Sequence, residues 1–299
     1  MVKTRSGLLI TFGLLSLTLV VAGIFISASN GVPAGVWVRN GIAWIVGALA
    51  ATGLSALKRR DILQVAVWAA PAGLAASLLG PGIQDVHRWV ALGPLHLNVA
   101  MLLLPAAVVA LAVLCTAGAW AWVACLAALV LLVVQPDASQ ATTLAAVAVL
   151  AAFAAFPQTV LRVGVAVIAT ALAGLAWLRP DPLDPVAEVE GILGLAFDLS
   201  PWLAAAAGLL LVGVAVLPVL WGLRGSPTER LAGAALGLCL LLWAVMPFLG
   251  AFPVPLMGLG MSPIIGAWLG VGLLASLRGN GSREGLRSGM GGLWTPRTS

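Results

Sequence analysis

The chain consists of long apolar stretches separated by short segments that hold proline, glycine or charged residues. A helix needs about 20 mainly apolar residues to cross ~30 Å of hydrocarbon. Ten stretches approach or reach this length, so we predict an all-α, polytopic membrane protein with about ten transmembrane helices. The predicted spans are Gly7 to Ala28, Trp37 to Leu57, Ile62 to Gly80, Asn98 to Ala117, Trp120 to Val134, Ala138 to Phe156, Val160 to Leu178, Pro201 to Leu223, Leu231 to Leu249 and Leu259 to Leu277.

These spans follow one another without a long linker, which indicates a single transmembrane helical domain over residues 1–278. Residues 279–299 are rich in Gly, Ser and Arg, a composition typical of disorder, and we predict a disordered cytoplasmic tail. Composition supports the membrane assignment, because 62% of the residues are hydrophobic and only 8% are charged. A soluble domain carries roughly a quarter charged residues. We therefore exclude a soluble protein.

The positions of Lys and Arg predict the orientation, since cytoplasmic loops hold an excess of them. With both termini inside, ten spans place 12 basic residues in the cytoplasm and three outside, while most acids fall outside. We predict a protein of the cytoplasmic membrane with cytoplasmic N- and C-termini. The net charge of +5 is then a topology signal and does not indicate a nucleic-acid partner. The three outer basic residues are Arg39, Arg88 and Arg179.

The first span has one alternative interpretation. A basic start with Lys3 and Arg5, an apolar run and small residues at 27–29 also resemble a cleavable signal peptide. The apolar run is longer than the usual 7–15 residues of a signal, so we favour a retained span. The three cysteines fall within predicted spans and predict no disulfide framework.

Polar residues that could support chemistry gather in three predicted outer segments, which are 82–96, 135–137 and 179–190. Each also has an ordinary structural interpretation. Arg88 and Trp89 could be an interfacial anchor, Asp137 could cap the next helix, and Glu188 and Glu190 could be solvated loop charges. His87 and His96 have no third ligand of fixed spacing, so they do not predict a metal site.

Together and in this order, the segments resemble the SEDS family, the bacterial cell-wall polymerases of the FtsW and RodA type. The resemblance extends from the first span to Leu277 and implies a SEDS-like helical bundle. A basic entry to the second span, an Arg-Trp with a Gly-Pro turn, a Gln-Pro-Asp and a last outer loop carry it. These motifs stand as Val38-Arg39-Asn40-Gly41-Ile42, Arg88-Trp89-Val-Ala-Leu-Gly93-Pro94, Gln135-Pro136-Asp137 and Pro255-Leu-Met-Gly-Leu-Gly260-Met-Ser262-Pro263.

The resemblance also assigns roles. Laid without gaps on Pro185 to Leu199, the family's loop before its eighth span sets Glu190 against the proposed catalytic Asp. It sets Asp198 against the first of two paired Glu residues. The implied catalytic residue is thus Glu190, and the implied substrate-binding residues are Arg88, Trp89, Gln135, Asp137, Asp198 and Ser262.

The implied activity is a peptidoglycan glycosyltransferase that polymerises lipid II on the outer face of the membrane, in cell division or cell-shape maintenance. A carboxylate near the attacking sugar hydroxyl can act as general base, and a cation can stabilise the departing pyrophosphate. Glu190 is the candidate base and Arg88 the candidate pyrophosphate contact. A divalent ion could assist, but no ligand set in the sequence demonstrates one. The family also implies a single-span transpeptidase partner.

Several family motifs are altered. Asn98-Val-Ala-Met101 stands where the family has Gln-Pro-Ser-Glu, and Glu188-Val189-Glu190 stands where it has His-Thr-Asp. A non-catalytic SEDS-like scaffold that binds a transpeptidase is therefore an alternative. A lipid flippase or transporter is a weaker alternative, because no predicted span has a clear charged residue near its centre.

Overall fold

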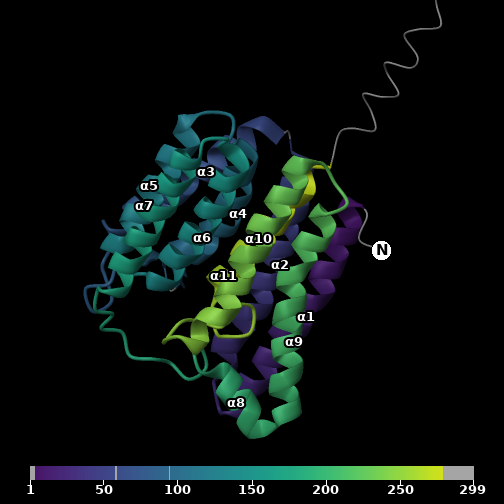
Figure 1. Cartoon of the computed structure of the whole chain (residues 1–299). Helices are drawn as coiled ribbons and strands as arrows, with labels where there is room; N and C mark the ends of the chain where they lie inside the picture. Colours follow the sequence, from purple (N-terminus) through teal and green to yellow (C-terminus); the bar gives the residue numbers. More distant parts are fainter. Residues whose placement is uncertain (1–3, 58, 94, 279–299) are drawn as a thin grey trace, which may run out of the picture.

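The computed structural model describes residues 4–57, 59–93 and 95–278 (Figure 1). The predicted tail, 279–299, lies outside the described residues. Within them, ten helices of 16 or more residues correspond one by one to the ten predicted spans, which confirms the all-α membrane fold. These helices are α1 (Arg5–Ser29), α2 (Ala34–Ala56), α3 (Arg59–Ser77), α4 (Val99–Leu114), α5 (Ala119–Val134), α6 (Ala138–Ala155), α7 (Thr159–Trp177), α9 (Pro201–Gly222), α10 (Pro227–Val245) and α11 (Met261–Ser276).

Six of the ten helices, α1, α2, α6, α7, α9 and α10, are long and apolar enough by themselves to cross a membrane. The other four are shorter apolar helices. A helix of 16 residues, such as α4 or α11, is about 24 Å long, less than the ~30 Å of a bilayer core. Most residues of α4 and α11 are nevertheless buried, because both lie at the centre of the bundle (Figure 1).

The central helices pack at close range. Gly266 of α11 lies against the backbone carbonyl of Met101 in α4, and a Cβ at this position would collide with that oxygen. Small residues at helix contacts let backbones approach closely in membranes, where packing replaces the hydrophobic effect as the driving force. The packed pair of α4 and α11 lies beneath the outer loops.

The first helix belongs to this bundle. α1 contacts α2, α9 and α11, and Leu8, Phe12 and Leu19 are fully buried. Near its outer end, Gly23 lies against the backbone of Met257 in the last outer loop. α1 therefore supports the segment that follows α10.

Two outer segments contain structure that the sequence did not predict. The segment between α3 and α4 forms an antiparallel hairpin of β1 (Trp89–Leu92) and β2 (Leu95–Asn98), in which Trp89 pairs with Asn98. A short helix, α8 (Ile192–Leu199), precedes α9 and packs against it and against α1. A short 3-10 helix, η1 (Met246–Phe248), follows α10.

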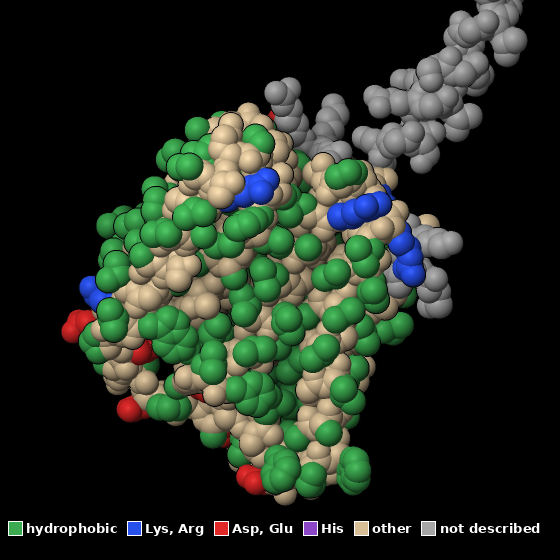
Figure 2. All heavy atoms as spheres, viewed as in Figure 1, with side chains coloured by type: hydrophobic (Ala, Val, Ile, Leu, Met, Phe, Trp, Pro, Cys, Tyr) green, Lys and Arg blue, Asp and Glu red, His purple; other side chains and the backbone are tan. Residues whose placement is uncertain are grey.

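Basic and acidic side chains lie mainly at opposite ends of the bundle. Figure 2 shows Lys and Arg side chains mainly at the end where α1 begins and α11 ends, and Asp and Glu side chains at the opposite end. This distribution is the one that the positive-inside rule requires. The cytoplasmic location of the termini stays a prediction.

Candidate functional site

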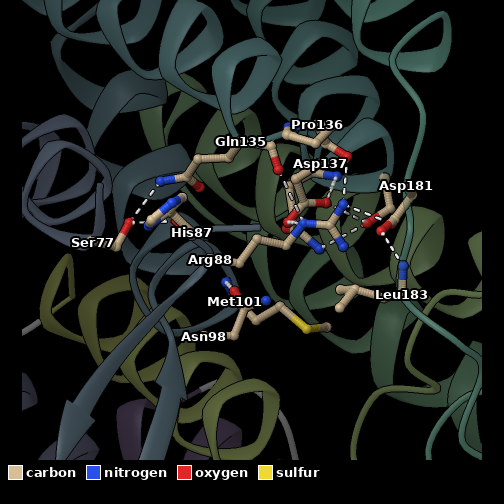
Figure 3. A network of polar contacts seen from close by, with 12 residues as sticks. Ser77, His87, Arg88, Asn98, Met101, Gln135, Pro136, Asp137, Asp181 and Leu183 are labelled. Atoms are coloured by element: carbon tan, nitrogen blue, oxygen red, sulfur yellow. Dashed lines mark hydrogen bonds and ion pairs between the residues drawn. The ribbon is translucent and has the colours of Figure 1, made fainter. Parts of the chain in front are cut away.

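Arg88 lies at the centre of a polar network among the outer loops (Figure 3). It directly precedes β1, and only 7% of its surface is exposed. Its guanidinium donates to the backbone carbonyls of Gln135 and Pro136, and its Nη2 donates to Asp181 Oδ2 at 2.7 Å. Its Nε lies 3.9 Å from Asp137 Oδ2. One cation thus connects the hairpin, the α5–α6 turn and the loop after α7.

Gln135 attaches the α5–α6 turn to α3. Its Nε2 donates to the carbonyl of Leu74 at 2.8 Å and to Ser77 Oγ at 2.7 Å, both near the end of α3. Ser77 Oγ in turn donates to the carbonyl of His87, next to Arg88. Gln135 is buried and does not line the cavities described below. Its contacts position Arg88.

Asp137 caps α6. Its Oδ1 accepts hydrogen bonds from the backbone N–H of Gln140 at 3.2 Å and from Ser139 Oγ at 3.1 Å. An Asp at this position satisfies one of the unpaired N–H groups of a helix start. The helix-capping interpretation of the sequence is therefore correct, and the same carboxylate also pairs with Arg88. The network continues from Gln140 to Trp243 Nε1, which donates to Gln140 Oε1 at 2.9 Å.

Glu190 ends a turn that begins at Val186. Its Oε2 accepts a hydrogen bond from the Val186 N–H at 2.8 Å, while its Oε1 makes no hydrogen bond within the described residues. Burial raises the pKa of the Glu190 carboxyl, and the charge of Asp181 adds to this rise. The backbone N–H groups of Val186 and Glu190 act in the opposite direction. Glu190 is thus a stronger base than an ordinary glutamate.

The backbone beside Glu190 is attached to the last outer loop. The Val254 N–H donates to the carbonyl of Val189 at 3.1 Å, and the Leu259 N–H donates to the carbonyl of Glu188 at 2.9 Å. Asn40 of α2 holds this loop from the other side. Its Nδ2 donates to the carbonyl of Gly258 at 2.9 Å, and its Oδ1 accepts from the Gly260 N–H at 3.1 Å.

These loops enclose one continuous cleft with two parts. The smaller part, of about 50 Å³, is lined by Arg88, Asp137 and Glu190 together with Asp181 and Asp184. At least one residue from each of the three predicted outer segments thus lines this part. The larger part, of about 390 Å³, is also lined by Glu190, and it extends to Ser262 at the start of α11. Trp89, Asn98, Met101, Leu183, Asp184, Glu190 and Pro253 line both parts.

The other predicted site residues fall in different places. Trp89 and Ser262 line the cleft, whereas Asp198 is exposed on α8 and does not. Asp198 therefore does not share the cleft with Glu190, although the two are close in sequence. In the described part of the chain, no group of three His, Cys, Asp or Glu side chains is placed to hold a metal ion. A role for a divalent ion stays a prediction.

Two residues important to this geometry escaped the sequence analysis. Asp181 belongs to the predicted outer segment 179–190, in which it has no assigned role, yet it contacts Arg88 and acts on the pKa of Glu190. Its position within Arg179-Pro-Asp181-Pro, where prolines restrict the backbone, was the available signal. The sequence indicates Asn40 only as part of the basic entry to the second span. Its burial and its contacts with the last outer loop are seen only in the structure.

The electrostatic balance of the smaller part is acidic. Asp137 and Asp181 compensate the charge of Arg88, and Asp184 and Glu190 line the same space. This region is suited to attract a proton or a hydroxyl donor, and an anion there would have to compete with the carboxylates for Arg88.

Comparisons with solved structures show which fold this arrangement belongs to. The rod-shape-determining protein RodA of Thermus thermophilus superimposes with a TM-score of 0.61 at 23% identity, over 89% of this chain and 95% of that one. This chain has the RodA fold. A point variant of the same RodA matches equally well, with a TM-score of 0.61 at 24% identity over 89% of this chain and 96% of that one.

A chain from the structure of a peptidoglycan synthase complex, in which polymerization and crosslinking are coordinated, is similar too. Its TM-score is 0.63 at 21% identity, again over 89% of this chain and 96% of that one. No protein-family model matches the sequence, and no curated protein matches it by sequence. The likeness to RodA therefore rests on the arrangement of helices and outer loops.

Proposed function

We propose that this chain is a SEDS-type peptidoglycan glycosyltransferase that polymerises lipid II on the outer face of the bacterial cytoplasmic membrane. The observation that carries the proposal is the position of Glu190, a half-buried carboxylate with a raised pKa in a cleft shared with Arg88 and Asp137. The RodA fold and the order of the outer motifs support it.

The chemistry requires a base. A sugar hydroxyl attacks the anomeric carbon of a second sugar, its proton leaves, and the bond to the lipid diphosphate breaks. Glu190 Oε1 makes no hydrogen bond within the described residues and so can accept that proton, while the Val186 N–H holds Oε2 in place. A base with a raised pKa takes up a proton more readily, which favours general-base catalysis near neutral pH.

The larger part of the cleft has the volume of an ordinary ligand site and can hold the reacting sugar of the substrate. Its volume of about 390 Å³ falls within the roughly 300–1,000 Å³ of ordinary ligand sites. Trp89 can provide an apolar face for a sugar ring, and Ser262 can donate a hydrogen bond. We assign Gln135 to positioning, because its amide N–H groups are engaged by α3. A substrate contact by Asp198 would require the lipid or the glycan strand to extend to α8.

The role predicted for Arg88, binding of the departing pyrophosphate, stays a prediction. Its guanidinium already contacts Asp181 and lies near Asp137. Asp181 is the more exposed partner, with 31% of its side chain accessible, and it lies on a loop. An anion that binds Nη2 of Arg88 would have to displace Asp181. Without such a displacement, Arg88 acts by holding the cleft together.

A direct experiment tests the proposal. The purified chain, reconstituted with lipid II, should form glycan strands that are detectable by gel electrophoresis, and Glu190→Gln should abolish most of this product. The RodA whose structure matches this chain provides a control for the assay. If the wild-type chain forms no strands in conditions where that RodA does, the enzyme proposal is wrong. Binding of a single-span transpeptidase by the inactive chain would then favour the scaffold function.

A further inference from the structure

A third recess continues from the larger part of the cleft, on the side away from Arg88. It has a volume of about 180 Å³ and shares His96, Leu259, Gly260 and Met261 with the larger part. Its other lining residues include Arg39 and Asn40 of α2. The cleft thus extends from Glu190, past the start of α11, to Arg39.

Arg39 differs from Arg88 in its surroundings. Within the described residues it makes no hydrogen bond and has no carboxylate within ion-pair distance, and its side chain is exposed. Arg88 is buried between two carboxylates. Of the two arginines along the cleft, Arg39 therefore has the charge that is available to an anionic ligand.

The start of α11 adds to this positive potential. Gly260 caps this 16-residue helix without a side-chain hydrogen bond of its own. The Gly260 N–H donates to Asn40 and Pro263 has no N–H, so the N–H groups of Met261 and Ser262 are the ones without a side-chain acceptor. Such groups and the helix dipole favour an anion. Ser262 is an independent sign of a ligand there. It is 97% buried, it lines the adjoining cleft, and its Oγ makes no hydrogen bond within the described residues.

Arg39 also lies next to exposed apolar residues of α2. Val38, Ile42 and Ile45 follow at helical spacing beside and below Arg39, and each is between 43% and 55% exposed. An apolar chain attached to an anion at Arg39 could lie along this side within the bilayer. An exposed cation next to an apolar, membrane-facing surface matches a ligand with an anionic head and a prenyl tail.

We propose that the recess formed by Arg39, His96 and the N-terminus of α11 binds the diphosphate of a lipid-linked sugar. The sugar would then extend along the cleft toward Glu190. The identity of the sugar rests on the proposed function, whereas the diphosphate site rests on the charges described here. As the bond to the sugar breaks, Arg39 and the start of α11 would stabilise the charge gained by the departing diphosphate.

Binding of a prenyl diphosphate tests the site without any turnover. The full chain, in nanodiscs of phosphatidylcholine, is titrated with geranylgeranyl diphosphate and, separately, with geranylgeraniol. We expect Arg39→Gln to weaken the affinity for the diphosphate by about tenfold or more and to leave that for the alcohol unchanged. Arg39→Lys should retain much of the affinity. The matched control is Arg179→Gln, which removes an exposed outer arginine far along the chain and should change the affinity less than twofold.

Competing anions separate the sources of the phosphate. Inorganic pyrophosphate should compete weakly because it lacks the tail, and phosphatidylglycerol should not compete at equal concentration because it has a single phosphodiester. Equal affinity of the wild type and Arg39→Gln would overturn the proposal, as would full competition by phosphatidylglycerol. The thermal unfolding temperature of Arg39→Gln, which we expect to equal that of the wild type, verifies that the variant is folded.

Failure of the diphosphate site and failure of the proposed function can be distinguished, because the two assays measure them separately. A chain that binds geranylgeranyl diphosphate through Arg39 but forms no glycan would retain the diphosphate site and lose the proposed enzyme activity. A chain that polymerises lipid II while Arg39→Gln binds the diphosphate normally would retain the activity and lose the site.

Discussion

Arg88 Nη2 lies 2.7 Å from Asp181 Oδ2, although the two residues are 93 positions apart. This ion pair joins the start of the β1–β2 hairpin to the loop between α7 and α8 (Figure 3). The same guanidinium also contacts the α5–α6 turn through two backbone carbonyls. Three outer segments therefore owe their relative positions to a single buried cation, and the shape of the cleft depends on it.

Removal of that cation should destabilise the fold. Arg88→Ala leaves Asp137, which is 3% exposed, as a buried carboxylate without its cation. Loss of one partner of a buried pair costs about 3–5 kcal/mol. We expect a clear decrease in the thermal unfolding temperature of the detergent-solubilised protein. Arg179→Ala, which removes an exposed arginine, should have little effect, and an equal decrease in both variants would refute the central role of Arg88.

Asn40 should control the order of the last outer loop. Both polar atoms of its amide are hydrogen-bonded to this loop, through Gly258 and Gly260. Asn40→Ala removes both bonds from a site that is 1% exposed, and each lost buried bond costs about 1–3 kcal/mol. Hydrogen exchange of the backbone N–H groups in 254–260 should become faster. Thr52→Ala, a substitution on the exposed surface of the same helix, is the control and should leave that exchange unchanged.

The pH dependence of polymerisation should report the pKa of Glu190. As a general base it acts in the ionised form, so activity is present above its pKa and is lost as the pH falls through it. Because that pKa is raised, the acidic limb of kcat/KM should lie above the ordinary 4.5. Asp181→Asn removes a charge that raises this pKa and should move the limb to lower pH.

A matched variant makes the test specific. Asp184 also lines the cleft, but it does not contribute to the shift at Glu190. Asp184→Asn should therefore move the limb less than Asp181→Asn does. A limb at the same pH in all three proteins would show that another group controls the profile.

The helical part of the fold could be predicted because apolar length alone defines a membrane span. All ten predicted spans became helices with ends that differ by a few residues, for example Asn98 to Ala117 against Val99–Leu114. The hairpin could not be predicted in this way. The residues of its two strands, Trp89–Leu92 and Leu95–Asn98, are half-buried or exposed without a regular alternation, so no period of two marks the strands.

The site could be predicted only in part for a similar reason. Motif order pointed to Arg88, Asp137 and Glu190, which do share one cleft. The contribution of Asp181 depends on a contact across 93 residues, and the prolines beside it restrict the local backbone without indicating this partner. Asp198, which the gap-free match set against a paired Glu, lies exposed on α8 and does not line the cleft, and a gap-free match carries no information on that helix.

The predicted orientation can be tested with single cysteines. Ser200 lies between α8 and α9, on the predicted outer side, and Ser226 caps α10 on the predicted cytoplasmic side. A membrane-impermeant thiol reagent added to intact cells should label Ser200→Cys and should not label Ser226→Cys. The native cysteines are buried and should remain unlabelled. The reverse pattern would invert the topology and place the cleft in the cytoplasm.

The two acids at the end of the 186–190 turn should differ strongly in importance. Glu190 lines both parts of the cleft and has a raised pKa, whereas Glu188 lines neither part. Glu190→Gln keeps the size of the side chain and removes the base, so it should lower polymerisation by ~10²-fold or more. Glu188→Gln should have little effect, because its contact with Leu259 is made by the backbone carbonyl.

Glu190→Asp separates the charge of this position from its geometry. It retains a carboxylate but shortens the side chain by one methylene, and it places in the turn the residue that the SEDS resemblance expects. We expect it to be far milder than Glu190→Gln and to retain measurable strand formation from lipid II. If Glu190→Gln and Glu188→Gln both polymerise almost as well as the wild type, Glu190 is not the base. The proton must then go to another group that lines the cleft, and the nearest carboxylate in sequence is Asp184.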